Sequence, residues 1–462
     1  MLCVVLALGL TGLAGLAGLA GPGPDRPSQP ASVLSEVDGQ GARMAAAQDL
    51  LSSRAKAVLA RNKSAWMATV DLPGSAFGRR QSLAYDNILK LPISDFSYDA
   101  VTSGAVTPGP VTSGPVTPGT VTPGTARPAP PIAGARAREA GPNEWVALVR
   151  GSYSLIGFDR TPRSFEATYT LVRRPAGWRI TDDADGATTG QLWDLPGLKV
   201  LPSRSGIVIG NAPQERMREY AAIADDAVRR VSGLWGTDWN ARVVLVTPST
   251  AEEFTGLLGS STDEDLDQAA LTQVAAVTQG GITPDQRAQG DQIVINPIAF
   301  AALQPDGRRM VVTHELTHVA VRSSTTRAVP TWLSEGMADY VGYADLALPR
   351  DRVASELLTL VRAGKGPESL PTAADFDPSR TEITTAYSGS WLAVSRLVDL
   401  YGQARVVAFY RAVAGGSTAY GAVQLDPDAS ARLAFPRSFG VTQPQFVEGW
   451  QRYLQTLARK RR

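Results

Sequence analysis

The chain has 462 residues, and its 45 Lys+Arg and 44 Asp+Glu give a formal net charge of +1. This balance excludes a strongly basic nucleic-acid-binding protein and an acidic solvating tail. The single cysteine, Cys3, excludes a disulfide framework and a cysteine-ligated zinc or iron–sulfur site. A hydrophobic fraction of 44% is typical of a globular protein.

Residues 2–20 form an apolar segment of mainly Leu, Ala, Gly and Val without a charged side chain. Small residues at its end, Gly18-Leu19-Ala20, suit a signal peptidase, although the basic residues expected before the apolar run are absent. We expect a signal peptide. An uncleaved anchor is the alternative, since about 20 apolar residues span a bilayer. Either interpretation predicts an extracellular or cell-surface protein.

Residues 33–193 are predicted to form an accessory domain. Residues 42–70 have apolar positions at helical spacing, and alternating strand-like segments follow. These segments lie at 96–100, 145–158 and 165–180, the last with a turn at 174–178. A long helix followed by antiparallel strands resembles the ketosteroid-isomerase-like cone fold. Because the region contains no evident acid–base pair, we expect it to be non-catalytic.

A repeat interrupts this domain. Residues 101–125 contain five Val-Thr-Ser/Pro-Gly units, and a Pro- and Gly-rich composition continues to residue 142. Pro-Gly and Ser-Gly pairs favour turns and remove backbone donors, so the segment 101–142 is predicted to be a solvated loop or spacer. Glycosylation of its threonines is an alternative role.

Residues 195–462 are predicted to form a second domain. Short strands are expected first, around a helix at 214–234, and helices follow. The expected strands are 206–210, 242–248, 271–280 and 292–297. The expected later helices are 308–321, 330–343, 351–363, 384–401, 404–413 and 443–459. Strands followed by helices indicate an α+β fold class.

Both histidines of the chain lie in one pentapeptide, His314-Glu315-Leu316-Thr317-His318. Side chains four residues apart share a helix face, so His314 and His318 can bind one metal ion, with Glu315 beside them as a general base. Catalytic zinc needs three protein ligands, and no third histidine exists, so a carboxylate must serve. Glu335 is the candidate, and Asp339 can orient one imidazole from the same helix face.

HELTH followed by Trp332-Leu333-Ser334-Glu335-Gly336-Met337-Ala338-Asp339-Tyr340 resembles the gluzincin metallopeptidases of the MA clan. The resemblance extends from about residue 205 to the C-terminus. It implies a zinc peptidase that binds one Zn²⁺ per chain through His314, His318 and Glu335. Glu315 matches the general base, and Asp339 matches the supporting carboxylate.

The gluzincin resemblance also implies a substrate-binding sheet edge and a further candidate side chain. Gluzincins hold the substrate as an added strand, and residues 271–280 or 292–296 would supply the edge here. Tyr387, in a segment similar to a later helix of that group, is a candidate hydrogen-bond donor to the oxyanion. A structural tyrosine is the alternative role.

The predicted function is therefore exported, zinc-dependent hydrolysis of peptide or protein substrates. A non-catalytic binding or adaptor protein of the cell envelope is the alternative, with zinc in a structural role. Structural zinc usually has a fourth side-chain ligand, commonly cysteine, which the chain does not offer beside HELTH. A third hypothesis is that the enzyme cleaves its own 101–142 segment.

Overall fold

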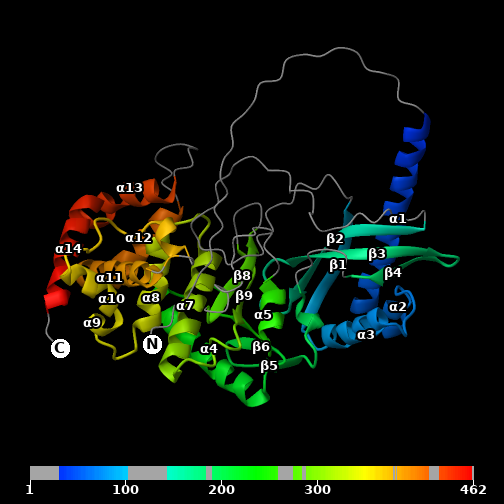
Figure 1. Ribbon diagram of the computed structural model, residues 1–462, viewed down its shortest axis with the longest axis horizontal. Helices are drawn as coiled ribbons and strands as arrows, with labels where there is room; N and C mark the ends of the chain where they lie inside the picture. The colour runs from blue at the N-terminus through cyan, green and yellow to red at the C-terminus, as the bar shows by residue number, and fades with distance from the viewer. Residues whose placement is uncertain are drawn as a thin grey trace, which may run out of the picture.

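The computed structural model describes residues 31–101, 143–183, 190–258, 274–282, 288–377, 380, 382–415 and 426–459 (Figure 1). The predicted export segment at 2–20 and almost all of the predicted loop at 101–142 lie outside the described residues. No helix within those described ranges has both the length and the apolar character needed to cross a membrane.

Helices and a curved antiparallel sheet form the N-terminal half (Figure 1). The helices are α1 (Ala31–Leu59), α2 (Lys63–Met67) and α3 (Ala76–Ile88). The strands, in spatial order, are β1 (Ile93–Val101), β2 (Glu144–Leu155), β3 (Arg163–Arg174) and β4 (Gly177–Asp182). This agrees with the predicted strand segments and with the α+β class.

The helix predicted over 42–70 is confirmed up to Leu59, but it does not continue as one helix to residue 70. The chain leaves α1 at Leu59 and turns through Arg61, which has a φ of 52°. Asn62 then caps α2, its side chain accepting a hydrogen bond from the Ala65 amide. An Asn at this position satisfies one of the free N–H groups of a new helix, which favours a break over continuation.

A mixed sheet forms the centre of the second half, with strand order β5-β6-β7-β9-β8. The strands are β5 (Lys199–Pro202), β6 (Gly206–Gly210), β7 (Val243–Thr247), β8 (Ala276–Ile282) and β9 (Ala288–Ile295). Because β9 pairs with both β7 and β8, residues 292–296 cannot supply a free edge, and that expectation is wrong. The antiparallel strand β8 forms one edge of the sheet.

Helices dominate the remainder of the described chain (Figure 1). They are α4 (Gln214–Trp235), α5 (Ala251–Leu258), α7 (Pro305–Ser324), α8 (Thr331–Tyr343), α9 (Arg350–Val353), α10 (Ser355–Arg362), α11 (Ile383–Tyr401), α12 (Gln403–Gly415), α13 (Pro427–Phe439) and α14 (Gln443–Arg459). The helix predicted over 351–363 is divided into α9 and α10 at Ala354.

The mixed sheet is buried on both faces. On one face Val208, Leu245 and Ile293 pack in the core that contains α4 and α7. On the other face Ile209 and Val244 belong to the hydrophobic core of the N-terminal half. Burial on both faces explains why β6 and β7 are continuous apolar runs rather than alternating ones.

Polar contacts join the two halves beside β9. Arg163 of β3 donates from Nη1 to Oε1 of Gln292 at 2.8 Å, while Asp159 accepts two further hydrogen bonds from the same guanidinium. The side chains of Arg163 and Asp159 are both buried. The N-terminal half is therefore held against the hairpin that contains the edge strand β8.

Candidate metal centre

Helix α7 carries the HELTH sequence through the interior of the molecule. It begins at Pro305, a residue that suits the first turn because the missing N–H would have no helical partner there. Every residue from Met310 to Arg322 is buried, including both histidines and Glu315. Because this part of α7 is covered on all sides, its polar side chains cannot rely on water for hydrogen bonds.

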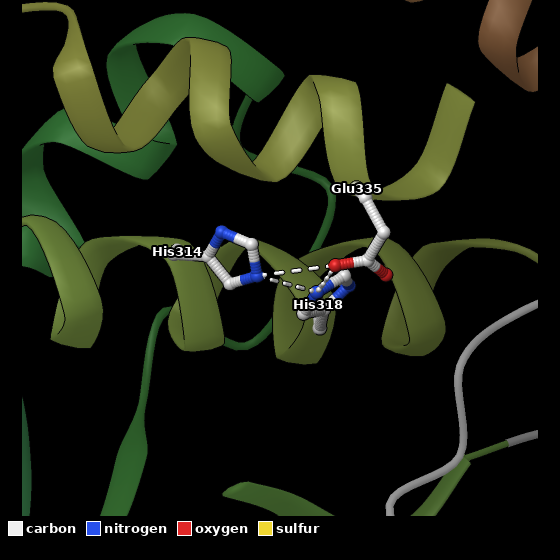
Figure 2. A group of neighbouring side chains, drawn as sticks. All are labelled: His314, His318 and Glu335. Carbon is white, nitrogen blue, oxygen red and sulfur yellow. Dashed lines mark hydrogen bonds and ion pairs between the residues drawn. The ribbon is translucent and has the colours of Figure 1, made fainter. Parts of the chain in front are cut away.

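Helix α8 presents Glu335 to the two histidines (Figure 2). It packs closely on α11: a Cβ added at Gly336 would lie 2.5 Å from the carbonyl oxygen of Ser390. Sequence reasoning missed this role for Gly336. The available signal was a glycine inside a helix, which costs about 1 kcal/mol relative to alanine and usually needs a packing reason.

His314, His318 and Glu335 converge on one point (Figure 2). The Nε2 atoms of the histidines are 3.1 Å apart, and Oε2 of Glu335 lies 3.3 Å from His314 Nε2 and 3.5 Å from His318 Nε2. Ligands about 2.0–2.2 Å from a tetrahedral zinc ion are about 3.3–3.5 Å from one another. The spacing of these three atoms therefore fits one tetrahedral ion.

Asp339 contacts the far side of the His314 ring, as its spacing from Glu335 predicts. Its Oδ1 atom lies 2.8 Å from His314 Nδ1. An ionised carboxylate can only accept, so the proton of this hydrogen bond belongs to Nδ1, and Nε2 is the ring nitrogen that faces Glu335 and His318.

The charges of the group are strongly coupled. Burial lowers the pKa of His314, but its contacts with Asp339 and Glu335 outweigh burial and raise that pKa well above the ordinary value. Burial raises the pKa of Glu335, but the neighbouring histidines outweigh it and lower that pKa to about 2. Glu335 is thus a carboxylate at neutral pH and favours a cation beside it.

Glu315 is buried next to this group and is held by a residue from the sheet. Thr278 of β8 donates a hydrogen bond from Oγ1 to Glu315 Oε2 at 2.7 Å, whereas Oε1 has no hydrogen-bond partner among the described residues. Burial raises the pKa of Glu315, opposed by the charges of the two histidines and by the Thr278 hydrogen bond. The sequence did not reveal the contact between Thr278 and Glu315. The alternation of a strand predicts which face of the sheet a side chain lies on, but not which helix it contacts.

Tyr387 lies in the second turn of α11 and is buried. Its ring packs edge-on against Phe376 with a centroid separation of 5.0 Å, and Ile383 and Ala386 belong to the same hydrophobic cluster. Its proposed role as an oxyanion donor stays a prediction.

Comparison with known families gives one match over this region. Residues 269–426 match the Peptidase MA superfamily. No curated protein matches the chain. The matched region contains β8, α7, α8 and α11, and therefore every residue of the candidate site, whereas the N-terminal half lies outside it. The match and the buried metal-binding group together indicate a metallopeptidase-like domain.

Proposed function

We propose that this chain is a zinc-dependent peptidase of the gluzincin type that hydrolyses peptide or protein substrates. The observation that carries the proposal is the buried group of His314, His318 and Glu335, with Glu315 adjacent, inside the region that matches the Peptidase MA superfamily. Export through residues 2–20 and an accessory role for residues 33–193 belong to the same proposal.

The donor set of the candidate site fits a metal ion. Glu335 is fully buried, and neither of its carboxylate oxygens accepts a hydrogen bond from a described residue. A buried carboxylate without donors is costly unless a cation compensates its charge. Two imidazoles and one carboxylate are the ligand types of catalytic zinc sites.

Each side chain then has a defined task in hydrolysis. A bound Zn²⁺ supplies a Lewis acid that polarises the scissile carbonyl and lowers the pKa of water. Glu315 Oε1 accepts the proton of the attacking water and passes it to the leaving amine as the C–N bond breaks. Asp339 holds the His314 ring in the orientation and tautomer that leave Nε2 free to coordinate.

The edge strand β8 is the proposed place for substrate. Among the described strands it pairs with β9 alone, and its Thr278 side chain contacts Glu315. An extended peptide added at this edge of the described sheet would lie beside the general base.

A non-catalytic adaptor with a structural zinc ion is the second candidate. Among the described residues, the group that can hold a metal contains three ligands, whereas structural zinc normally has four. The buried Glu315 carboxylate with an unpartnered oxygen also has no evident task in such a protein. Both observations favour the peptidase.

Purified wild type, Glu315→Gln and His318→Ala should be compared for zinc content and for cleavage of a quenched peptide library. We expect Glu315→Gln to retain zinc and lose at least about 100-fold in kcat, the size of a general-base contribution. His318→Ala should lose zinc. Wild type with stoichiometric zinc and no cleavage of any peptide, or undiminished cleavage by Glu315→Gln, would contradict the proposal.

A further inference from the structure

Thr278 and Glu315 form a contact between the edge strand and the metal-binding helix. Thr278 is buried, and the alternation of β8 places Ala276 in the core that contains α7 and Val277 in the opposite core. The Thr278 hydroxyl lies 2.7 Å from Glu315 Oε2 and 3.0 Å from the backbone oxygen of Glu315. Hydroxyl and carboxylate are thus enclosed together.

One hydroxyl proton serves these two acceptors. A threonine hydroxyl donates a single hydrogen bond, and the bond to an ionised carboxylate is stronger than the bond to a neutral carbonyl. While Glu315 is ionised, the proton is therefore directed at Oε2. This leaves Oε1 as the Glu315 oxygen without a hydrogen-bond partner in the described structure.

The position of β8 over α7 is fixed by a second contact along the same helix. Arg322, four residues beyond His318, forms a buried ion pair with Asp291 of β9 at 3.0 Å. The same guanidinium donates to the carbonyl oxygens of Gly280 and Gly281 in β8. The strand is thus attached to α7 at two points, Glu315 and Arg322, which lie on either side of His318 and keep Thr278 in register with Glu315.

We propose that Thr278 is a positioning residue for the general base: its hydroxyl holds Oε2 of Glu315, so that Oε1 is the atom that takes the proton from water. This inference rests on the proposed peptidase function for its catalytic consequence. Its structural consequence, the fixed orientation of the Glu315 carboxylate, does not require that function.

Three variants separate the hydroxyl from the packing of the side chain. Thr278→Val keeps the shape and removes the donor, whereas Thr278→Ser keeps the donor. Thr247→Val is the matched control, because Thr247 is a buried threonine of the same sheet whose hydroxyl has no hydrogen-bond partner among the described residues. Zinc content, kcat and KM should be measured for each full-length variant, and crystal structures solved for wild type and both Thr278 variants.

We expect Thr278→Val to keep its zinc and to lose about 10–100-fold in kcat with KM within about twofold, a part of the full general-base effect. Thr278→Ser should recover kcat to within about threefold of wild type, and Thr247→Val should match wild type. In the crystals, the Glu315 carboxylate should rotate or become mobile in Thr278→Val and stay in place in Thr278→Ser.

Other results would overturn the proposal. An unchanged kcat in Thr278→Val, an equal loss in both Thr278 variants, or a loss confined to KM would each contradict a role for the hydroxyl in positioning the base. An unmoved carboxylate in the Thr278→Val crystal would do so even if wild type cleaved no peptide. Absence of cleavage by wild type, in contrast, counts against the peptidase function.

Discussion

Asp339 controls the orientation in which His314 presents its Nε2 atom. Asp339 contacts the opposite ring nitrogen, Nδ1, so it is not placed to bind an ion held by Nε2. It accepts the hydrogen bond from Nδ1 and so fixes both the tautomer and the ring orientation. Its buried carboxylate also raises the pKa of the imidazole. In the proposed metal site, Asp339 would therefore affect metal affinity in two ways that experiments can separate.

Asp339→Asn should weaken zinc binding by about 10–100-fold, the usual effect of losing a carboxylate behind a histidine ligand. Competition with a chromophoric chelator measures this affinity. Asp306→Asn is a suitable control, because Asp306 is an exposed acid in the first turn of the same helix. Equal affinities for Asp339→Asn and wild type would show that the contact does not support the ligand.

Zinc binding should weaken as the pH falls. Zinc requires the neutral imidazole, and the raised pKa of His314 means that a proton competes at a higher pH than for an ordinary histidine. Below that pKa, displacing one proton costs up to about tenfold in affinity per pH unit. Zinc titrations across a pH series test this, and an affinity independent of pH below neutrality would contradict it.

The group of side chains that could hold a metal was predictable from residues alone, whereas the partner of Glu315 was not. Two histidines four apart define a helix face, and the absence of a third histidine forces a carboxylate, which makes Glu335 the natural choice. Thr278 is separated from Glu315 by 37 positions, and only the folded sheet brings them together. Local spacing carries no information on such a contact.

At the scale of helices and strands, the packing of α8 against α11 decides where Glu335 lies. Gly336 is adjacent to this proposed ligand, and its missing side chain lets the two helices approach. A bulkier residue must either push α11 away or move Glu335 relative to the histidines. Helix packing and the proposed metal binding therefore depend on the same position.

Gly336→Ala should destabilise the protein by about 1–3 kcal/mol, the cost of overpacking a close interface, and should also weaken zinc binding. Gly233→Ala in α4 is the matched control: nothing lies within 4 Å of the added Cβ, so this variant should gain up to about 1 kcal/mol. Denaturant unfolding of the metal-free proteins measures both values. A neutral Gly336→Ala would contradict the packing argument.

The positions of strands and helices along the chain were largely predictable. Which strands pair with each other in the sheet was not. Apolar runs located β6, β7 and the end of β9, residues 293–295, because these residues are buried on both faces. Sheet order depends on pairing between distant segments, so the sequence could not say that β9 is internal and β8 lies at the edge. Helix breaks at Asn62 and Ala354 were missed because the apolar spacing continues across them.

For the whole molecule, the two predicted domains share a hydrophobic core. Side chains from β6 and β7 pack in the same cluster as those from β2, β3 and Trp193. Removing residues before 195 would expose an apolar sheet face made of Ile207, Ile209, Val244 and Val246. Such a surface favours aggregation when it is left uncovered.

We therefore expect the full chain to unfold in one cooperative transition, and a 195–462 fragment to bind an apolar dye and to self-associate. Calorimetry of the full chain and light scattering of the fragment test these outcomes. Two separate transitions, together with a monomeric fragment that binds zinc as tightly as the full chain, would instead indicate independent domains.

The central position of β7 also has a kinetic consequence. Its backbone is shielded laterally by β6 and β9, and its two faces are covered by different halves of the chain. Solvent reaches its amide hydrogens only when both coverings have separated. We therefore expect the amide hydrogens of residues 244–246 to exchange most slowly. Their exchange rate would report global unfolding of the protein rather than local opening of either half.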